Sequence, residues 1–247
     1  MNRLDYFMMR KELNRFSWFK DNDYLPDIYA QLSDYEWMVM ERYFNTTERD
    51  EMFGECNIPI MSEMIGFIHG SNLDKVIQLG HYAGWSSLMF GFALRRMGAK
   101  RALWSVDIRG DITDYADRWI QIAELEDIVH LETGDSSSIW MPDLAKQYHG
   151  VDPKMIFIDS SHQYDQTMKE LGLWYAKLQE GGLIFLHDVS ISAKSFDTTN
   201  GGGVHDAFLA FAPLYSESMM LNEYVTNEYV LVRQDGCGAG IIQKGKS

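Results

Sequence analysis

The pattern of hydrophobic and polar positions changes near residue 76. From there on, apolar runs of four or five residues alternate with longer amphipathic stretches. We predict five strands from these runs: VIQL at 76–79, ALWSV at 102–106, IVHL at 128–131, MIFI at 155–158 and LIFL at 183–186. Strands that are apolar throughout are typical of a parallel sheet that helices cover on both faces.

The stretches between these runs predict helices at 85–98, 113–126, 162–179 and, after the fifth strand, 204–212. The alternation of strand and helix indicates an α/β fold with a doubly wound, Rossmann-like sheet. The end of the chain differs, because YVLVRQ and IIQKG have the pattern of two strands joined by the turn-rich DGCGAG. They predict a C-terminal antiparallel hairpin at the edge of the mostly parallel sheet.

Residues 1–70 predict a helical N-terminal cap. Apolar side chains recur there at roughly helical spacing, namely Ile28, Leu32, Trp37, Met40 and Phe44. A second helix is expected at 60–70, ended by Gly70. We therefore divide the chain into a cap at 1–70 and an α/β domain at 71–247. The cap would line a substrate pocket or contact a second copy in a homodimer. Its first aromatic residues would be core or pocket; these are Tyr6, Phe7, Phe16, Trp18 and Phe19.

Charge and composition narrow the class of ligand. The formal net charge is −14, which argues against nucleic acid and against an anionic membrane surface, because both need a basic face. No apolar run approaches the roughly 20 residues of a membrane helix, and the N-terminus lacks the pattern of a signal peptide. Cys56 and Cys237 have no metal-ligand spacing and are expected as reduced thiols. A cytoplasmic protein with a small-molecule substrate fits these features best.

The loop after the first strand has the composition of a ligand site. Gly80 and Gly84 allow a sharp turn and a close approach of the backbone. Ser86 and Ser87 stand at the start of the next helix, where N–H groups bind carboxylates or phosphates. Tyr82 occupies the middle glycine position of a G-x-G-x-x-G fingerprint, which disfavours a pyrophosphate. An ordinary strand-to-helix turn is the alternative.

Acidic residues follow the next two strands. Asp107 stands where a carboxylate accepts hydrogen bonds from ribose hydroxyls in nucleoside sites. Asp135 and Ser136 stand where an adenine edge would lie, although such a pair is also common in turns. Asp107 alone would equally suit a helix cap, but its separation from the glycine loop favours a nucleoside site.

Two carboxylates and two imidazoles follow the fourth and fifth strands. Asp159 and Asp188 could share a hard divalent cation such as Mg²⁺. His162 has a near-neutral reference pKa and suits removal of a proton from a hydroxyl. Each histidine alone would more often be structural, but the convergence of His162 and His187 with two carboxylates favours catalysis.

The run VIQLGHYAGWSS, SVDI, GDSS, FIDSSHQY and GGLIFLHD resembles the class I S-adenosylmethionine-dependent methyltransferases. Within them it resembles the small-molecule O-methyltransferases of the cephalosporin-hydroxylase-like and macrolide-sugar group. The resemblance covers residues 76–244 and makes 71–247 the methyltransferase domain. It implies that the loop from Gly80 to Ser87 holds the methionine part of the cofactor, Asp107 the ribose, and Asp135 and Ser136 the adenine.

The resemblance also implies a mechanism. Asp159 and Asp188 would bind a divalent metal, and His162 would deprotonate a substrate hydroxyl that attacks the methyl group in line. The acceptor would be a sugar or a natural-product intermediate. Two departures stand out. Gln78 replaces the usual acidic residue, and the neighbours of Asp188, where a second carboxylate or amide is frequent, are His187 and Val189. His187 could ligate a metal, although imidazole suits softer metals better than Mg²⁺.

Other functions stay open from the sequence. The enzyme could work without metal or methylate nitrogen, or the fold could bind NAD or another nucleotide. A catalytically silent protein that binds the cofactor is a further alternative. The glycine-rich stretch at 189–204 would be a lid or a surface connection.

Overall fold

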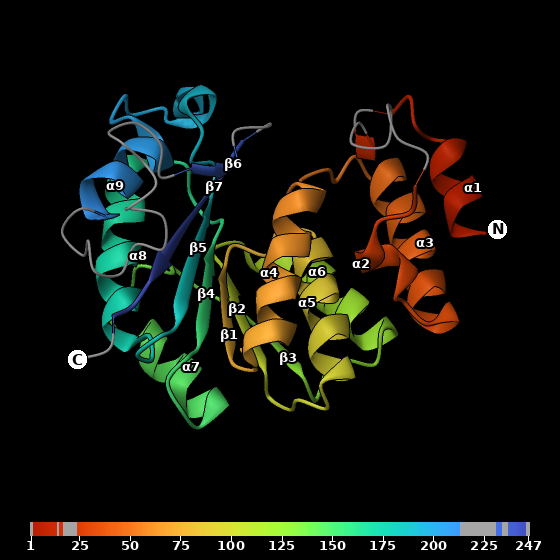
Figure 1. Ribbon diagram of the computed structural model, residues 1–247, viewed down its shortest axis with the longest axis horizontal. Helices are drawn as coiled ribbons and strands as arrows, with labels where there is room; N and C mark the ends of the chain where they lie inside the picture. Colours follow the sequence, from red (N-terminus) through yellow and green to blue (C-terminus); the bar gives the residue numbers. More distant parts are fainter. Residues whose placement is uncertain (1, 14, 17–23, 213–230, 234–236, 246–247) are drawn as a thin grey trace.

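The computed structural model describes residues 2–13, 15–16, 24–212, 231–233 and 237–245. Its centre is a sheet of seven strands in the order β3-β2-β1-β4-β5-β7-β6 (Figure 1). The strands are β1 (Val76–Leu79), β2 (Leu103–Asp107), β3 (Val129–Thr133), β4 (Met155–Ile158), β5 (Leu183–His187), β6 (Leu231–Arg233) and β7 (Ala239–Gln243). Strands β1 to β5 pair in parallel, and β7 pairs antiparallel with β5 and β6. The predicted fold is confirmed, including the antiparallel C-terminal pair.

Helices cover both faces of the sheet, as the apolar strands require. On one face lie α4 (Ile58–Ser71), α5 (Trp85–Arg96) and α6 (Gly110–Ile122), and on the other lie α7 (Met141–His149), α8 (Tyr164–Lys177) and α9 (Gly203–Phe211). Successive residues of a strand point to opposite faces, so Val76 packs with the first set of helices and Ile77 with the second. Each face therefore has its own hydrophobic core.

Helix α7 is an element that the sequence pattern did not predict. It has only nine residues and begins beside a proline, Pro142, at the first turn, where proline is tolerated. It ends at Gly150, whose φ of 78° gives the left-handed conformation of a helix C-terminus. The short length and the serine-rich stretch before it hid the helical period.

The N-terminal region is helical, as predicted, with two different boundaries. The residues at helical spacing from Ile28 to Phe44 belong to two helices, α2 (Asp27–Ala30) and α3 (Asp34–Arg49). The division follows from a capping box, in which Ser33 and Glu36 exchange hydrogen bonds between side chain and backbone. Helix α4 continues past Gly70 and ends at Asn72, which takes the left-handed conformation.

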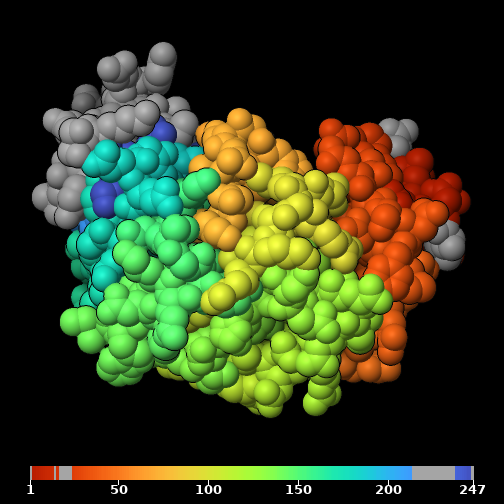
Figure 2. Space-filling view, turned by 90° about the horizontal axis from the view of Figure 1, so that it is seen from below, coloured from red at the N-terminus to blue at the C-terminus, as the bar shows by residue number. Residues whose placement is uncertain are grey.

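The helices α1 (Arg3–Met8), α2 and α3 lie at one end of the molecule, seen in red and orange in Figures 1 and 2. A cluster of buried rings fills this end, made of Tyr6, Phe7, Phe16, Tyr29, Trp37 and Phe44. These rings are core, while Trp18 and Phe19 lie outside the described residues. Glu36 on α3 accepts from Arg95 on α5 at 2.7 Å and ties the two regions together. The division at residue 70, the homodimer and the cytoplasmic location stay predictions.

Across the residues that the structure describes, none of the helices has both the length and the apolar character to cross a membrane.

Candidate active site

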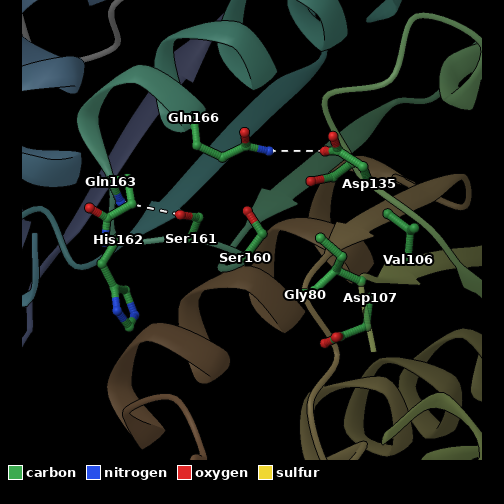
Figure 3. A pocket seen from close by; sticks show the side chains of 11 residues that line it. Gly80, Val106, Asp107, Asp135, Ser160, Ser161, His162, Gln163 and Gln166 are labelled. Carbon is green, nitrogen blue, oxygen red and sulfur yellow. Dashed lines mark hydrogen bonds between the residues drawn. The ribbon is translucent and has the colours of Figure 1, made fainter. Parts of the chain in front are cut away.

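A cleft lies over the carboxyl ends of the strands, where the strand order reverses between β1 and β4. Ligands bind at this place in doubly wound sheets. The cleft consists of two cavities of about 500 and about 390 Å³. Both are lined by Gly80, Asp107, Ile108, Ser160 and His162, so they form one continuous site. Figure 3 shows the larger cavity. Sequence positions as distant as 80 and 162 therefore meet because each follows a parallel strand.

Position 80 requires glycine because two segments of backbone approach each other closely there. Its φ is 87°, which favours glycine. A β-carbon built at this position would stand 2.2 Å from the backbone oxygen of Asp159. Gly84, with a φ of 95°, precedes α5, and a β-carbon there would stand 3.0 Å from the β-carbon of Ala116. Both glycines are therefore required by geometry, as the sequence suggested.

The buried side chain of Gln78 forms hydrogen bonds with the loop from Gly80 to Ser87. Its Nε2 donates to the carbonyl oxygen of Gly80 at 2.8 Å and to Oγ of Ser86 at 2.6 Å. Ser87 in turn donates its hydroxyl to Oε1 of Gln78 at 2.8 Å. The amide and both hydroxyls are buried. Ser86 lines the smaller cavity, whereas the side chain of Ser87 takes part in the internal structure of the loop.

Asp107 joins the first two strand ends. One carboxylate oxygen accepts from the backbone N–H of Tyr82 at 3.0 Å and of His81 at 3.3 Å, and the other accepts from the backbone N–H of Arg109 at 3.1 Å. Tyr82 takes a φ of 42° and lines the smaller cavity. The carboxylate fixes the loop backbone and also borders both cavities.

His81 is a residue of the loop to which the sequence analysis gave no role. Its ring is buried, with Nδ1 at 3.1 Å from Oγ of Ser105 and Nε2 at 3.0 Å from Oγ1 of Thr113. Burial lowers its pKa to about 4, against the opposing charge of Asp107. The ring is therefore neutral at pH 7 and connects the loop to α6.

The larger cavity extends to the loop after β3. Asp135 accepts from the backbone and the hydroxyl of Ser137 and, at 3.2 Å, from Nε2 of Gln166. Partial burial opposes these hydrogen bonds, but together they lower the pKa of Asp135. Ser136 is buried and donates its hydroxyl to Glu170 on α8. Asp135 and Ser136 therefore lie in the same cavity as Asp107, as predicted.

The ends of β4 and β5 bring four ionisable side chains together. Nε2 of His162 lies 3.0 Å from Oδ2 of Asp188. Nδ1 of His187 lies 3.2 Å from Oδ1 of Asp188 and 3.2 Å from Oδ1 of Asp159. Asp188 has a φ of 60°, a left-handed conformation that non-glycine residues seldom adopt. This turn presents its two carboxylate oxygens to two different histidines.

The charges of this group depend on one another. Burial lowers the pKa of His187, but the carboxylates of Asp159 and Asp188 outweigh it and raise the pKa to about 10. The hydrogen bond that His162 donates to Asp188 raises the pKa of His162, whose side chain is 47% exposed. Although burial acts in the opposite direction, the two histidines hold the pKa of Asp188 well below its usual range. Burial raises the pKa of Asp159 in spite of His187.

Asp159, His187 and Asp188 also have the arrangement of a metal site. One potential ligand atom of each lies within 4.8 Å of the other two. Two carboxylate oxygens and one imidazole nitrogen fit a divalent cation, and the nitrogen favours a transition metal over Mg²⁺. The set contains the predicted pair, Asp159 and Asp188, together with His187, which the sequence indicates as a further possible ligand.

The segment after β5 is held against His162. It contains the 3-10 helix η2 (Ile191–Phe196), and the ring of Phe196 lies 5.3 Å from that of His162. Asp197 accepts from the backbone N–H of Gly203 at 2.8 Å and of Tyr164 at 3.3 Å. These bonds connect the glycine-rich stretch to the first turn of α8.

The structure gathers most of the predicted site residues in the cleft. Those that line it are Gly80, Tyr82, Ser86, Asp107, Asp135, Ser136, Asp159 and His162. Three predicted residues line neither cavity, namely Gly84, Ser87 and Asp188. No role was predicted from the sequence for Ser160, Gln166 or Glu170. Only Ser160 could have been found from the sequence, because it lies in the loop that follows a strand.

Comparisons with known proteins agree with this fold. Residues 77–189 match a family model described as a methyltransferase domain, and no curated protein sequence matches the chain. An O-methyltransferase from Bacillus cereus, solved with S-adenosylhomocysteine, is similar in structure, with a TM-score of 0.65, 14% identity, and 93% of this chain and 96% of that chain covered.

Two further solved structures share the fold. The O-methyltransferase TomG from Streptomyces achromogenes, involved in tomaymycin synthesis and solved with S-adenosylmethionine, has a TM-score of 0.60 and 12% identity, with 87% and 92% covered. The Podospora anserina methyltransferase PaMTH1, bound to S-adenosylhomocysteine, has a TM-score of 0.59 and 16% identity, with 87% and 89% covered.

Proposed function

We propose that this chain, whose residues 77–189 match a methyltransferase domain, is a class I methyltransferase that transfers a methyl group from S-adenosylmethionine to a hydroxyl of a small molecule. The observation that carries the proposal is the continuous cleft from Asp135 to His162. At one end it offers the acceptors that a nucleoside needs, and at the other a histidine paired with a carboxylate. Cofactor-bound O-methyltransferases with the same fold support it.

The cofactor would lie across the strand ends. Gly80, Tyr82 and Ser86 border the smaller cavity and suit the methionine part, while Gly84 and Ser87 give the loop its shape. Asp107 borders both cavities and would accept from the ribose hydroxyls. Asp135 and Ser136 border the larger cavity and would meet the adenine.

His162 would act as the general base. Its Nε2 faces Asp188, so the hydrogen bond places the ring proton on Nε2 and leaves the lone pair on Nδ1. Nδ1 would take the proton of the substrate hydroxyl as the hydroxyl oxygen attacks the methyl carbon and the bond from that carbon to sulfur breaks, which leaves S-adenosylhomocysteine. Asp188 then stabilises the imidazolium that forms.

Asp159, Asp188 and His187 would hold a divalent cation if one binds. When bound, such a cation would supply positive charge that orients the hydroxyl and stabilises the developing alkoxide. The three residues keep their positions through the 3.2 Å contacts of His187 with both carboxylates. We propose Mg²⁺ or a divalent transition metal.

The acceptor would enter through the smaller cavity. The linker between α3 and α4 contributes Phe53 and Gly54 to its wall, so the N-terminal region borders the site. A sugar or a natural-product intermediate is our proposed acceptor class. TomG takes part in the synthesis of a natural product, which supports this class.

A second candidate keeps the cofactor but needs no metal. His187 lies between two carboxylates and has a raised pKa, so its positive charge neutralises them as a metal would. In this candidate His162 alone activates the acceptor, and methylation of nitrogen is also open to it.

Calorimetric titration tests the proposal. The protein would be titrated with S-adenosylhomocysteine and with NAD, each with and without Mg²⁺ or Mn²⁺. Micromolar binding of the first ligand and none of the second is expected, and binding of NAD alone would overturn the proposal. Methyl transfer measured before and after exhaustive chelation then separates the metal-assisted candidate from the metal-free one.

A further inference from the structure

Glu170 is a buried carboxylate directly behind the larger cavity, and the proposed chemistry does not use it. It lies on α8 with no exposed surface. Its Oε1 accepts hydrogen bonds from the hydroxyl of Ser136, from that of Ser160 at 2.6 Å and from Nε2 of Gln166 at 3.3 Å. Its Oε2 is also buried and has no hydrogen-bond partner among the described residues. Three of its neighbours, Ser136, Ser160 and Gln166, line the cavity.

These bonds fix which way the cavity wall presents its polar atoms. A serine hydroxyl has a single hydrogen, and Ser136 and Ser160 both direct it to Glu170. They therefore offer only lone pairs to a ligand. Nε2 of Gln166 donates to Asp135 and to Glu170, which occupies its hydrogens and leaves its carbonyl oxygen.

The direction of the hydroxyls does not depend on the charge of Glu170. Burial raises the pKa of this carboxyl, against the three hydrogen bonds. If a proton is bound, Oε2 is its place, because Oε1 already faces three donors. Oε1 accepts from both serines in either state.

We propose that Glu170 is a positioning residue that makes this wall of the cavity an acceptor surface, so that the site selects a base edge carrying an amine over one carrying a carbonyl. Around the same part of the cavity, Figure 3 shows Asp135, Ser160 and Gln166. The inference rests on the proposed function and adds the source of base selectivity. Adenine presents such an amine, and hypoxanthine presents a carbonyl oxygen in its place.

The variant Glu170→Gln should reverse the direction of the serine hydroxyls, so that this wall of the cavity offers hydrogen-bond donors. If the amide oxygen takes the place of Oε1, its two N–H groups occupy the buried position of Oε2, where no partner exists. If the amide nitrogen instead faces the serines, the amide oxygen takes the buried position of Oε2. An acceptor without a partner among the described residues already occupies that position in the natural protein. Because unpaired buried donors are costly, we expect the second orientation. The hydroxyls of Ser136 and Ser160 would then turn their hydrogens into the cavity.

The test compares two ligands that differ at this edge, S-adenosylhomocysteine and S-inosylhomocysteine, by calorimetry. The natural protein should prefer the first. In Glu170→Gln the ratio of the two affinities should fall by about tenfold or more, since each reversed hydrogen bond contributes roughly 0.5–1.5 kcal/mol. Asp165→Asn is the matched control, because it makes the same chemical change at an exposed position of α8 and should leave the ratio unchanged.

A folded Glu170→Gln protein with an unchanged ratio would overturn the inference, while the proposed function stands as long as S-adenosylhomocysteine binds. If the natural protein binds neither ligand, both fail. If Glu170→Gln does not fold, Ser160→Ala replaces it, since it removes one acceptor and adds no donor. A ratio that falls in Ser160→Ala supports the inference, and an equal loss for both ligands overturns it.

Discussion

Oδ2 of Asp188 lies 3.0 Å from Nε2 of His162 and accepts a hydrogen bond from it, while Oδ1 of the same carboxylate lies 3.2 Å from Nδ1 of His187. The left-handed turn at Asp188, directly after β5, makes this double contact possible. One buried carboxylate thus orients the exposed histidine of the cleft and is itself held by a second histidine. Because Nε2 of His162 faces Asp188, Nδ1 is the ring nitrogen to which we assign the proposed proton transfer.

His162→Ala should lower kcat by about 10²–10⁴-fold, the usual contribution of a positioned general base. The affinity for S-adenosylhomocysteine should change little, because the ring lies at the acceptor end of the cleft. Steady-state kinetics and calorimetry measure the two quantities. His130→Ala, at a half-exposed surface position, is the control and should keep full activity. A His162→Ala protein with normal kcat would remove His162 from the mechanism.

Asp107→Ala should weaken cofactor binding strongly. The substitution removes proposed acceptors for the ribose and also releases the backbone N–H groups of His81, Tyr82 and Arg109. Loss of one hydrogen bond to a charged group costs about 1.5–3 kcal/mol, so an increase in Kd of at least about tenfold is expected. Asp107→Asn keeps one acceptor oxygen and should lie between the two. Calorimetry with S-adenosylhomocysteine that finds equal affinity for all three proteins would exclude Asp107 from the site.

Gly80→Ala should destabilise the fold far more than Gly98→Ala. Both glycines have positive φ, at 87° and 70°, and this conformation costs an alanine about 1–2 kcal/mol. Only at Gly80 would the β-carbon also collide with backbone, at 2.2 Å from the oxygen of Asp159, whereas at Gly98 nothing lies within 4 Å. Urea unfolding of the two variants measures the difference. Equal midpoints would mean that β1 and β4 separate at this point without cost.

Two buried histidines should make the protein sensitive to mild acid. Burial and the nearby charge of Lys75 lower the pKa of His149 to about 3, and burial lowers that of His81 to about 4. The unfolded chain binds a proton on each near pH 6.5, whereas the folded protein does not. The stabilisation that these two histidines contribute is therefore complete above pH 6.5 and is lost as the pH falls toward 3. Each histidine contributes on the order of 1 kcal/mol per pH unit in this window.

His149→Phe isolates one of these contributions. Neither ring nitrogen of His149 has a hydrogen-bond partner among the described residues, so a ring without nitrogen loses none. The free energy of unfolding, measured in urea at several pH values, should fall less steeply below pH 6.5 in the variant. A slope identical to that of the natural protein would show that His149 is protonated in the fold.

The sequence predicted the fold and most of the cleft because both depend on strand ends. VIQL and MIFI have the bounds of β1 and β4, and the residues that follow them meet wherever parallel strands share an edge. Glu170 could not be predicted in this way. It stands in the middle of a helix, and only the packing of α8 behind two strand-end loops brings its carboxylate to Ser136 and Ser160. The division of α2 from α3 depended on a capping box that hydrophobic period alone does not reveal.

The buried amide of Gln78 constrains how this loop can evolve. Class I methyltransferases usually carry an acid at that position, yet here the carbonyl of Gly80 needs the N–H that the amide donates. A carboxylate in its place would set oxygen against oxygen at 2.8 Å, even though both serines could still donate to it. The substitution Gln78→Glu alone would therefore be harmful, and it would be tolerated only if the loop backbone also changed. Gln78 and the path of the chain at Gly80 thus depend on each other.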